Sequence, residues 1–519
     1  MPSRIRYPGR DIGHRLRDIG RSGWPAPVAE YTTDVAIVGS GVAGLTTAWR
    51  LAREGHTRFA LVAGPEPHGN ASSGSASVGG ERLRYPTGGH YLPLPSIEST
   101  HVRTMLADFG VLLDGIDGPT PTYDERVVVH APDERLYRDG RWQEGLVPSG
   151  RGTNTDGSAI DRFLGVVETL RDARGVDGRK VFAVPLALSS SDPRWTALDA
   201  IPFATWLARE GHDDPALRWY LDYCCRDDYG ANASGVSAWA GLHYFAARNG
   251  QARNADRGAV LTWPEGLDAM AMRLEAGAFE PRSGRPQPLR LEGSALSIRE
   301  TGGGVDVLCA RVDPAGLSTF VVHARRAVCA MPLFVARHVV DELKGDRRQS
   351  MTPQVAPWMV ANFVMRRRPD EADGAALAWD NVLYGSDGLG YVVSTHQDIR
   401  VAPSPATVFT AYRALADRSP DAARRWMDTA SASEIGTLAA GELRAVYGWR
   451  FAPCVERVEI TLRGHGMATP VPGTLLDPGL RALRESDGRI LYAHSDLSGY
   501  SVFEEAAWWG WRAAERLLG

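Results

Sequence analysis

The chain has 519 residues, which is more than one small core needs and suits two or three domains. Its hydrophobic content of 44% and charged content of 23% are those of an ordinary soluble globular protein. The net charge of −4 gives no electrostatic reason to expect nucleic acid or an anionic membrane as a partner. We find no secretory signal and no apolar run long enough to span a bilayer, and we therefore expect a cytoplasmic enzyme.

The five cysteines show no CxxC or zinc-finger spacing, so we expect neither a disulfide framework nor a metal site. Lysine occurs only twice, at Lys180 and Lys344. Chemistry based on lysine therefore has only two candidate residues.

The first predicted elements surround a glycine-rich turn. Residues 34–38 predict an apolar strand, residues 45–53 an amphipathic helix and residues 59–62 a second strand. The turn matches GxGxxG and consists of Gly39, Ser40, Gly41, Val42, Ala43 and Gly44. The first glycine permits the tight turn, the second lets a pyrophosphate approach the backbone, and the third lets the helix pack closely on the strand. We expect a dinucleotide at this helix N-terminus, and a glycine turn without a ligand is the competing interpretation.

The fingerprint alone does not choose between NAD, NADP and FAD. An acidic side chain about 20 residues further on usually binds a ribose, but Val62, Ala63 and Gly64 occupy that region. Glu66 is the nearest acid. We therefore expect Glu66 or a backbone group to hold the adenosine ribose.

Strand and helix patterns recur in three separated stretches, residues 34–95, 289–332 and 489–519. The simplest architecture is an α/β fold with a Rossmann-like FAD-binding domain assembled from discontinuous segments. We assign residues 30–99, 255–335 and 480–519 to that domain. We assign residues 100–254 and 336–479 to a mixed α+β substrate domain, and residues 1–29 to an N-terminal extension.

Several segments resemble the flavin-containing amine oxidase superfamily, which also includes protoporphyrinogen oxidases and phytoene desaturases. The fingerprint extends to GSGVAGLTTAWRLAREG, and PTGGHYLP is similar to the family segment that passes beneath the flavin. LTWPEGLDAMAMRL, ALSIRE and ARRAVCAMP match further family segments, and LYAHSDLSGYSVFEEAAWWGWRAAERLL resembles the C-terminal flavin signature. The resemblance therefore implies FAD as the cofactor. It adds these residues to the expected cofactor site: Ala63, Gly69, Asn70, Gly88, Gly89, His90, Ala295, Asp496, Val502 and Phe503.

The C-terminal segment also suits a flavin physically. A helix starting near Val502 aims its N–H groups at the pyrimidine edge, where negative charge gathers on reduction. The resemblance places Asp496 at the ribityl or phosphate region. No cysteine follows Cys454, so this segment offers no thiol and we expect FAD to be bound non-covalently.

Candidate substrate-side residues come from the two inserts. The resemblance places residues 463–473 at the substrate face of the flavin, where His465 is the main candidate for acid/base chemistry and Met467 a lining residue. His396 is a second catalytic candidate. In the helical insert, Asp228, Trp239 and Tyr244, with Asp227 and His243, form a candidate site for a cationic amine. The competing interpretation of His465 is a histidine whose ring hydrogen-bonds to the backbone. For the helical insert, the competing interpretation is a helix cap followed by a helix that faces the core.

We expect an FAD-dependent oxidoreductase that takes a hydride from a carbon next to nitrogen onto flavin N5, with dioxygen as acceptor. The substrate is a small amine or an amino-acid-like molecule, and a homodimer is left open. Neither lysine falls near residues 360–363, where many amine oxidases hold a water with a lysine. One alternative is a desaturase or dehydrogenase acting on C–C bonds. The other is a non-catalytic binding protein that kept the fold.

Overall fold

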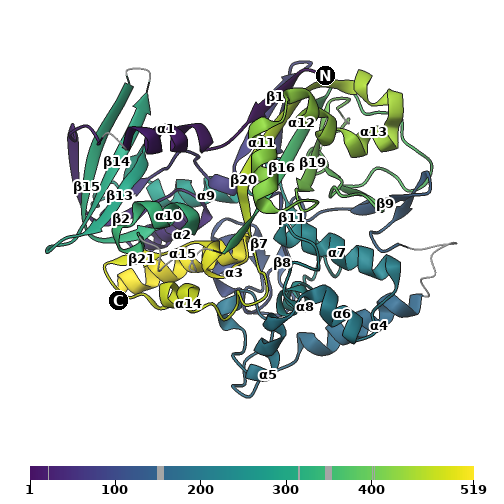
Figure 1. The fold of residues 1–519 in the computed structure, drawn as a ribbon, viewed down its shortest axis with the longest axis horizontal. Helices are drawn as coiled ribbons and strands as arrows, with labels where there is room; N and C mark the ends of the chain where they lie inside the picture. The colour runs from purple at the N-terminus through teal and green to yellow at the C-terminus, as the bar shows by residue number, and fades with distance from the viewer. Residues whose placement is uncertain (21–22, 149–156, 314–315, 345–352, 400, 403) are drawn as a thin grey trace. The chain divides into compact units, whose positions relative to one another are not determined.

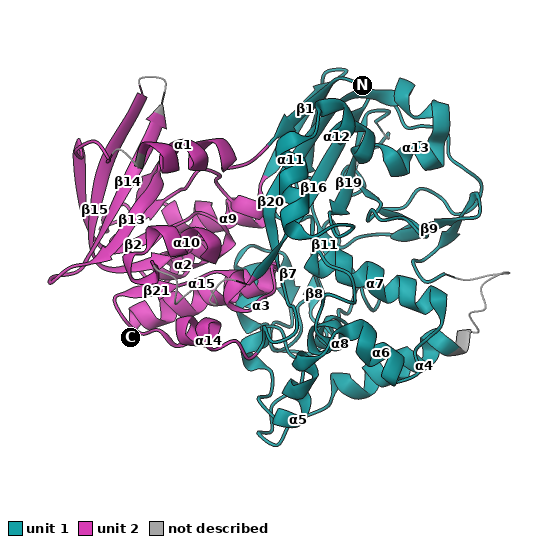
Figure 2. Cartoon of the chain, viewed as in Figure 1, with its two compact units in different colours: residues 1–6, 73–267, 354–475 teal, residues 7–72, 268–353, 476–519 magenta. Residues whose placement is uncertain are grey.

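The structure is a computed structural model, and it describes residues 1–519 except 21–22, 149–156, 314–315, 345–352, 400 and 403. The chain divides into two compact units, each made of three segments (Figure 2). Unit 1 contains residues 1–6, 73–267 and 354–475, and unit 2 contains residues 7–72, 268–353 and 476–519.

Unit 2 contains a sheet with helices (Figure 1). Its strands are β2 (Ala29–Val38), β3 (Phe59–Val62), β12 (Leu289–Leu291), β13 (Ser294–Glu300), β14 (Val305–Asp313), β15 (Gly316–Cys329) and β21 (Ile490–Tyr492). Its helices are α1 (Arg10–Gly20), α2 (Val42–Arg53), α9 (Asp268–Phe279), α10 (Leu333–Val339), α14 (Pro478–Glu485) and α15 (Phe503–Leu518).

The strand order in this sheet is β12-β3-β2-β15-β14-β13, and β21 pairs with β15. β12, β3, β2, β15 and β21 run parallel, whereas β14 pairs antiparallel with β13 and β15. The β2-α2-β3 crossover is the unit that places a glycine turn at the carboxyl end of a parallel strand. The sheet therefore forms a Rossmann-like layer from three separate parts of the chain.

Helix α2 is held between the sheet and other helices by its apolar face. Leu45, Ala48 and Ala52 are fully buried, and α2 contacts α9 and α15. A Cβ on Gly510 of α15 would lie 2.2 Å from the carbonyl oxygen of Ala43, so only glycine permits this approach. The hydroxyl of Thr47 donates to the Gly510 carbonyl at 3.0 Å, which fixes the register between the two helices.

Unit 1 is built on an eight-stranded sheet of order β1-β20-β16-β19-β18-β17-β9-β10. These strands are β1 (Ser3–Arg6), β20 (Val455–Thr469), β16 (Gln354–Met365), β19 (Thr407–Ala414), β18 (Tyr391–Val393), β17 (Asp380–Leu383), β9 (Glu134–Arg138) and β10 (Arg141–Glu144). Short pairs join β4 (Ser73–Val78) to β5 (Glu81–Pro86), β6 (Tyr91–Pro93) to β11 (Val260–Thr262), and β7 (Leu112–Asp114) to β8 (Thr122–Tyr123).

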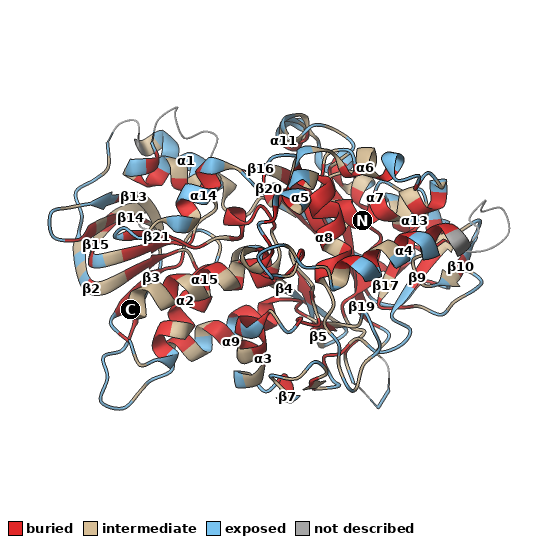
Figure 3. Cartoon of the chain, turned by 90° about the horizontal axis from the view of Figure 1, so that it is seen from below, coloured by how far each residue is buried: buried red, intermediate tan, exposed pale blue. Residues whose placement is uncertain are grey.

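The helices of unit 1 are α3 (Thr100–Asp108), α4 (Gly157–Arg171), α5 (Pro193–Thr196), α6 (Phe203–Arg209), α7 (Pro215–Tyr229), α8 (Ala238–Ala247), α11 (Pro420–Thr429), α12 (Ala432–Ala439) and α13 (Gly441–Tyr447). Figure 3 shows that α8 is largely buried, as its apolar sequence requires. All but one of the twelve residues of β16 are at least partly buried, so this strand is a central part of the core.

The expected α/β class and the sheet built from discontinuous segments are both present. Residues 73–99 and 255–267 are grouped with unit 1, although the sequence assigned them to the nucleotide domain. Within the stretch expected to be an N-terminal extension, residues 3–6 pair in parallel with β20 in unit 1.

Candidate functional site

The glycine turn at the end of β2 assigns a separate steric role to each glycine. Gly39 has φ +115°, and a Cβ there would lie 2.5 Å from the Ala330 carbonyl oxygen. A Cβ on Gly44 would lie 1.9 Å from the Gly39 carbonyl oxygen. Gly41, in contrast, has no atom within 4 Å of an added Cβ. The first and third glycines therefore serve packing, and the second faces open space where a ligand can approach the backbone.

The start of helix α2 suits an anion. Gly41 is its N-cap in an extended conformation, and no side chain caps the helix. The N–H groups of the first turn point away from the helix, and the helix dipole adds partial positive charge. A pyrophosphate fits this cradle, which a Cβ on Gly41 would fill. Val42 is partly exposed and Ala43 is buried, so contacts there come from backbone groups.

Ser40 and Ala63 fix the turn. The Ser40 hydroxyl donates to the Ala63 carbonyl at 2.6 Å, and both residues are buried. Ala63 is 1% exposed, so its side chain is sealed in the core at the position where a ribose-binding acid was expected. Both residues shape the site rather than reach into it.

The loop after β3 lies against the glycine turn. The His68 N–H donates to the Ser40 carbonyl at 3.0 Å, and a Cβ on Gly69 would lie 3.7 Å from Gly41 Cα. The Glu66 carboxylate accepts a hydrogen bond from the Ser72 hydroxyl at 3.0 Å. Asn70 is exposed in the short helical turn Gly69–Ala71. The loop after β3 therefore places Gly69 beside Gly41, and Glu66 lies on the same loop.

Three more expected cofactor residues lie in other parts of unit 2. Asp496 is 3% exposed, and its Oδ2 accepts the Leu333 N–H at 2.8 Å, which caps helix α10. Val502 is the N-cap of α15, without a side-chain cap, and Phe503 is buried. The Asp496 carboxylate is therefore already engaged in holding two segments of unit 2 together.

Ala295 lies on β13 opposite Cys309, next to a register shift between Ala295 and Ser297. It is partly exposed.

In unit 1, the segment Gly88-Gly89-His90 is tied down through its carbonyl groups. The Gly88 carbonyl accepts the Tyr412 hydroxyl at 3.0 Å, and the Gly89 carbonyl accepts the Leu267 N–H at 3.1 Å. The His90 carbonyl accepts the Thr262 hydroxyl at 2.6 Å. Hydrogen bonds therefore hold the backbone of this segment in a defined position.

The side chains around His90 form a ring cluster of His90, Tyr91, Trp379 and Tyr412. The His90 imidazole stacks on Tyr412 with centroids 4.4 Å apart. It also lies 4.9 Å from Tyr91 and 5.6 Å from Trp379, centroid to centroid. Burial lowers the pKa of His90 to about 3, so its ring is neutral at ordinary pH. The His90 ring therefore adds no positive charge to the aromatic faces of the cluster, and the nearby guanidinium of Arg248 is paired with Asp228.

Two carboxyl groups border the ring cluster. The Tyr91 hydroxyl donates to Oδ2 of Asp227 at 3.3 Å, and Asp380 directly follows Trp379. Burial and the neighbouring Asp228 raise the pKa of Asp227 to about 6. Burial, Asp227 and Glu134 raise the pKa of Asp380 well above its ordinary value. Asp227 and Asp380 are both partly exposed, and the cost of burying an ionised carboxylate favours pairing with a cation.

The other expected substrate residues fall in different surroundings. Asp228 is buried and paired with Arg248. Trp239 is 0% exposed and stacks on His243, whose Nε2 lies 2.8 Å from the Ala183 carbonyl oxygen. Tyr244 is partly exposed. The helical insert therefore brings Asp227 to the ring cluster, whereas Trp239 packs in the core of the insert.

The catalytic candidates His465 and His396 lie on different strands or loops of unit 1. His465 is exposed on β20, and Met467 two residues later is partly exposed. Nε2 of His396 lies 2.8 Å from the His130 carbonyl oxygen, and its ring stacks on the His130 ring. Burial lowers the pKa of His396 to about 4, so this imidazole is neutral near pH 7.

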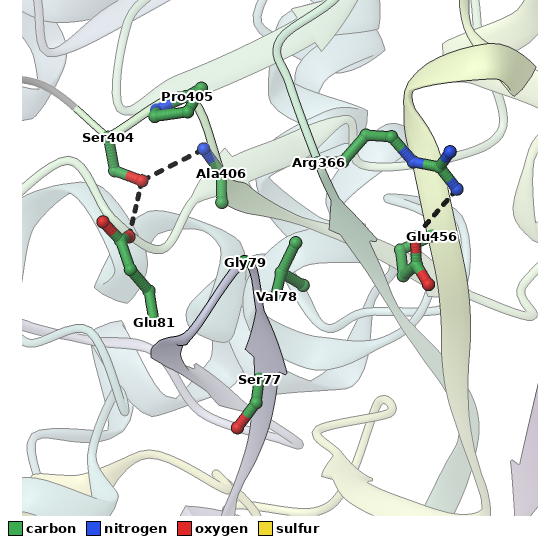
Figure 4. Close-up of a pocket in the computed structure, with 9 residues that line it drawn as sticks. All are labelled: Ser77, Val78, Gly79, Glu81, Arg366, Ser404, Pro405, Ala406 and Glu456. Atoms are coloured by element: carbon green, nitrogen blue, oxygen red, sulfur yellow. Dashed lines mark hydrogen bonds and ion pairs between the residues drawn. The ribbon is translucent and has the colours of Figure 1, made fainter.

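A surface hollow in unit 1 is lined by Ser77, Val78, Gly79, Glu81, Arg366, Ser404, Pro405, Ala406 and Glu456 (Figure 4). Its polar groups bond to one another: Ser404 donates to Glu81, and Arg366 pairs with Glu456 at 2.7 Å. None of the expected site residues lines it. We therefore place the candidate chemistry at the ring cluster.

Comparison with known proteins bears on the fold of the chain. A family model described as an NAD(P)-binding Rossmann-like domain matches residues 37–109. Putrescine oxidase solved with putrescine bound has a TM-score of 0.63 and 16% sequence identity, covering 94% of this chain and 99% of that chain. The chain has the amine oxidase fold. Cyclohexylamine oxidase from Brevibacterium oxydans IH-35A gives a TM-score of 0.62 and 16% identity, covering 93% of this chain and 98% of that chain.

A comparison with curated proteins finds no match. Among the described residues, no helix has the length and apolar character needed to cross a bilayer.

Within the amine oxidase fold, residues 360–363 are where the resemblance places a lysine. The polar side chain in this stretch is that of Asn362, which is 0% exposed. Its amide donates to the Pro86 carbonyl at 3.0 Å and accepts the Thr410 hydroxyl at 2.7 Å. Lys180 pairs instead with Glu98, and Lys344 pairs with Asp341. Asn362 therefore anchors the segment that leads into Gly88-Gly89-His90.

The sequence interpretation missed Asp380, Trp379 and Tyr412. Asp380 is the first residue of β17, Trp379 directly precedes it, and Tyr412 lies on β19. Strand β18 pairs with both β17 and β19 and so brings these residues together. WD at 379–380 is a weak signal because an aromatic residue before an acid is common in any chain. The distance in sequence from His90, about 300 residues, hides the contact from any local pattern.

Proposed function

We propose that the protein is an FAD-dependent oxidoreductase that oxidises small amines. The observation that carries this proposal is the pairing of a neutral ring cluster with two partly accessible carboxyl groups, Asp227 and Asp380, next to the segment Gly88-Gly89-His90. The resemblance assigns that segment to the surroundings of the flavin. Aromatic faces and carboxylates are the groups that recognise an ammonium ion.

The pyrophosphate and ribose part of the cofactor site would be formed by unit 2. The backbone at Gly41 and the start of α2 would hold the pyrophosphate, as their open approach and uncapped N–H groups favour. Glu66 would hold the adenosine ribose in place of the missing strand-end acid. Asp496 and the N-terminus of α15 would face the flavin end. Bound FAD supplies a hydride acceptor at N5 and a route for the electrons to dioxygen.

The residues of unit 1 would bind and prepare the substrate. An amine arrives mostly as an ammonium ion, but hydride loss from the adjacent carbon needs the neutral amine lone pair. Asp227 has a pKa of about 6, so near pH 7 its Oδ2 can accept the ammonium proton. Tyr91 would hold that carboxyl group in place through its hydroxyl. His90, Trp379 and Tyr412 would orient the substrate and exclude water.

Two comparisons support an amine as substrate. The similar structures include a putrescine oxidase with putrescine and a cyclohexylamine oxidase. The charge distribution also favours an amine over the C–C desaturase alternative, because two carboxyl groups would be costly beside an apolar substrate.

The proposal is tested with the purified protein in two steps. The first step records the visible spectrum, with and without added FAD. The second follows hydrogen peroxide and ammonia release from a panel of monoamines, diamines and cyclic amines. We expect flavin absorption and peroxide release with at least one amine. Absence of flavin uptake would contradict the enzyme interpretation, and flavin without reaction toward any amine would favour the desaturase alternative.

A further inference from the structure

His68, in the loop between β3 and β4, has a left-handed backbone conformation. Its φ is +63°, a left-handed value that non-glycine residues rarely adopt without support. Gly69 follows with φ +55°. Two successive left-handed residues turn the chain sharply at the point where it meets the glycine turn. Something must therefore hold His68 in place.

Both ring nitrogens of His68 face carboxylates on helix α9. Nδ1 bonds to Oδ1 of Asp268, and Nε2 lies 3.1 Å from Oε2 of Glu275. A carboxylate only accepts hydrogen bonds, so both contacts are satisfied together only when both nitrogens carry a proton. Burial alone would lower the pKa of His68, but the hydrogen bonds and charges of Asp268 and Glu275 outweigh it and raise that pKa.

Two other charged side chains lie near this contact, and neither displaces Asp268 or Glu275 from His68. From β12, Arg290 bonds to the second oxygen of Glu275. From the loop itself, Glu66 bonds to the Ser72 hydroxyl. His68 is thus joined to α9 by two ionic hydrogen bonds, and Glu275 is joined in turn to the sheet.

The backbone of His68 carries this attachment to the dinucleotide turn. Its N–H donates to the Ser40 carbonyl at 3.0 Å, and Gly69 lies beside Gly41. Ser40 and Gly41 are the residues that the pyrophosphate would approach. The position of the loop against Gly41 therefore depends on the attachment of the His68 ring to α9.

We propose that His68 is a positioning residue for the dinucleotide site, and that its imidazolium form holds residues 64–72 against Ser40 and Gly41. Loss of the proton breaks one of the two contacts with α9, releases the loop and weakens cofactor binding. Cofactor affinity therefore falls as the pH rises through the raised pKa of His68, and it is highest below the ordinary histidine value. This inference rests on the proposed binding of FAD in unit 2.

The test measures FAD binding to apo-protein by quenching of flavin fluorescence, over a pH series from 6 to 10. We expect the dissociation constant of the wild type to rise several-fold with pH. H68Q should bind FAD several-fold more weakly at low pH and lose most of the pH dependence. D268N should retain a pH dependence but shift its midpoint to lower pH, because one raising charge is gone. H56Q changes an exposed histidine of the same unit and should behave like the wild type.

Hydrogen exchange of the apo-protein supplies a readout independent of FAD. After correction for the intrinsic pH dependence of amide exchange, the protection of residues 64–72 should fall at high pH in the wild type and be low at all pH values in H68Q. Equal pH profiles for wild type and H68Q, in FAD binding and in exchange, would overturn the role of His68 while leaving the proposed function standing. Failure to bind FAD at any pH would contradict the proposed function, and exchange would still report on His68.

Discussion

Asp227 is the residue on which the proposed substrate chemistry depends most directly. Its carboxyl group combines a hydrogen bond from Tyr91, partial accessibility and a pKa raised to about 6. A carboxylate in this setting can bind an ammonium ion and also take its proton.

We predict that amine oxidation by the wild type rises with pH through about 6, because Asp227 must be ionised to act. D227N should lower kcat/KM by about 10²-fold or more, the usual range for loss of a proton acceptor, and remove this limb of the pH profile. D213N, which changes an exposed aspartate paired with Arg218, is the matched control. An unchanged profile in D227N would rule out Asp227 as the group that titrates.

The same substitution should stabilise the apo-protein. The folded-state pKa of Asp227 lies above its ordinary value of 3.8, so the folded state loses stability as pH rises from about 4 to about 6. The cost at neutral pH is on the order of 3 kcal/mol, since one pKa unit corresponds to about 1.4 kcal/mol. D227N should therefore raise the melting temperature at pH 7.5 and leave it nearly unchanged at pH 4. A lower melting temperature at pH 7.5 would mean that the charge of Asp227 is compensated in the fold.

At the scale of elements, the β2-α2-β3 crossover was predictable and the ring cluster was not. The second strand was predicted at 59–62 and lies there, and the helix predicted from 45 begins at Val42. Local spacing suffices for these elements because a glycine turn, an apolar strand and a helical period are read within about 30 residues. His90 and Tyr412 meet only after the eight-stranded sheet has formed, so no local pattern reveals their contact.

The same contrast holds within the cofactor site. The fingerprint predicted packing roles for Gly39 and Gly44, and the contacts of these two glycines agree with it. The attachment of His68 to α9 joins residues 200 positions apart, and nothing near His68 in the sequence signals it. The engagement of Asp496 with the N-terminus of α10 was equally hidden.

The glycine turn gives a matched pair of substitutions. G41A adds a Cβ in open space at a φ of −72°, so the protein should fold with nearly wild-type stability and bind FAD at least about tenfold more weakly. G44A places a Cβ 1.9 Å from the Gly39 carbonyl oxygen and should destabilise unit 2 by about 1–3 kcal/mol or more. Thermal unfolding and FAD titration separate the two effects. If G41A bound FAD like the wild type, the pyrophosphate would not lie at Gly41.

At the scale of the whole molecule, each of the two units is assembled from three stretches of chain. The dinucleotide turn belongs to unit 2, and the ring cluster with Asp227 and Asp380 belongs to unit 1. The proposed pyrophosphate contacts at Gly41 and the proposed amine contacts at Asp227 therefore come from segments of different units.

Cofactor binding should stabilise the folded chain in proportion to its occupancy. At a free FAD concentration 100 times the dissociation constant, the gain is about 2.7 kcal/mol, which should raise the melting temperature by several degrees. Thermal unfolding of apo-protein with increasing FAD checks this expectation, and NAD at the same concentrations is the control. Equal stabilisation by NAD would mean that the dinucleotide turn does not select FAD.

The most direct test of the account is anaerobic reduction of the bound flavin by an amine. The purified protein is loaded with FAD, freed of oxygen and mixed with a small amine while the visible absorption is followed. The account predicts that the wild type bleaches and that D213N behaves alike, whereas D227N bleaches about 10²-fold more slowly. Flavin that stays oxidised with every amine, or bleaches at the same rate in D227N, would contradict it.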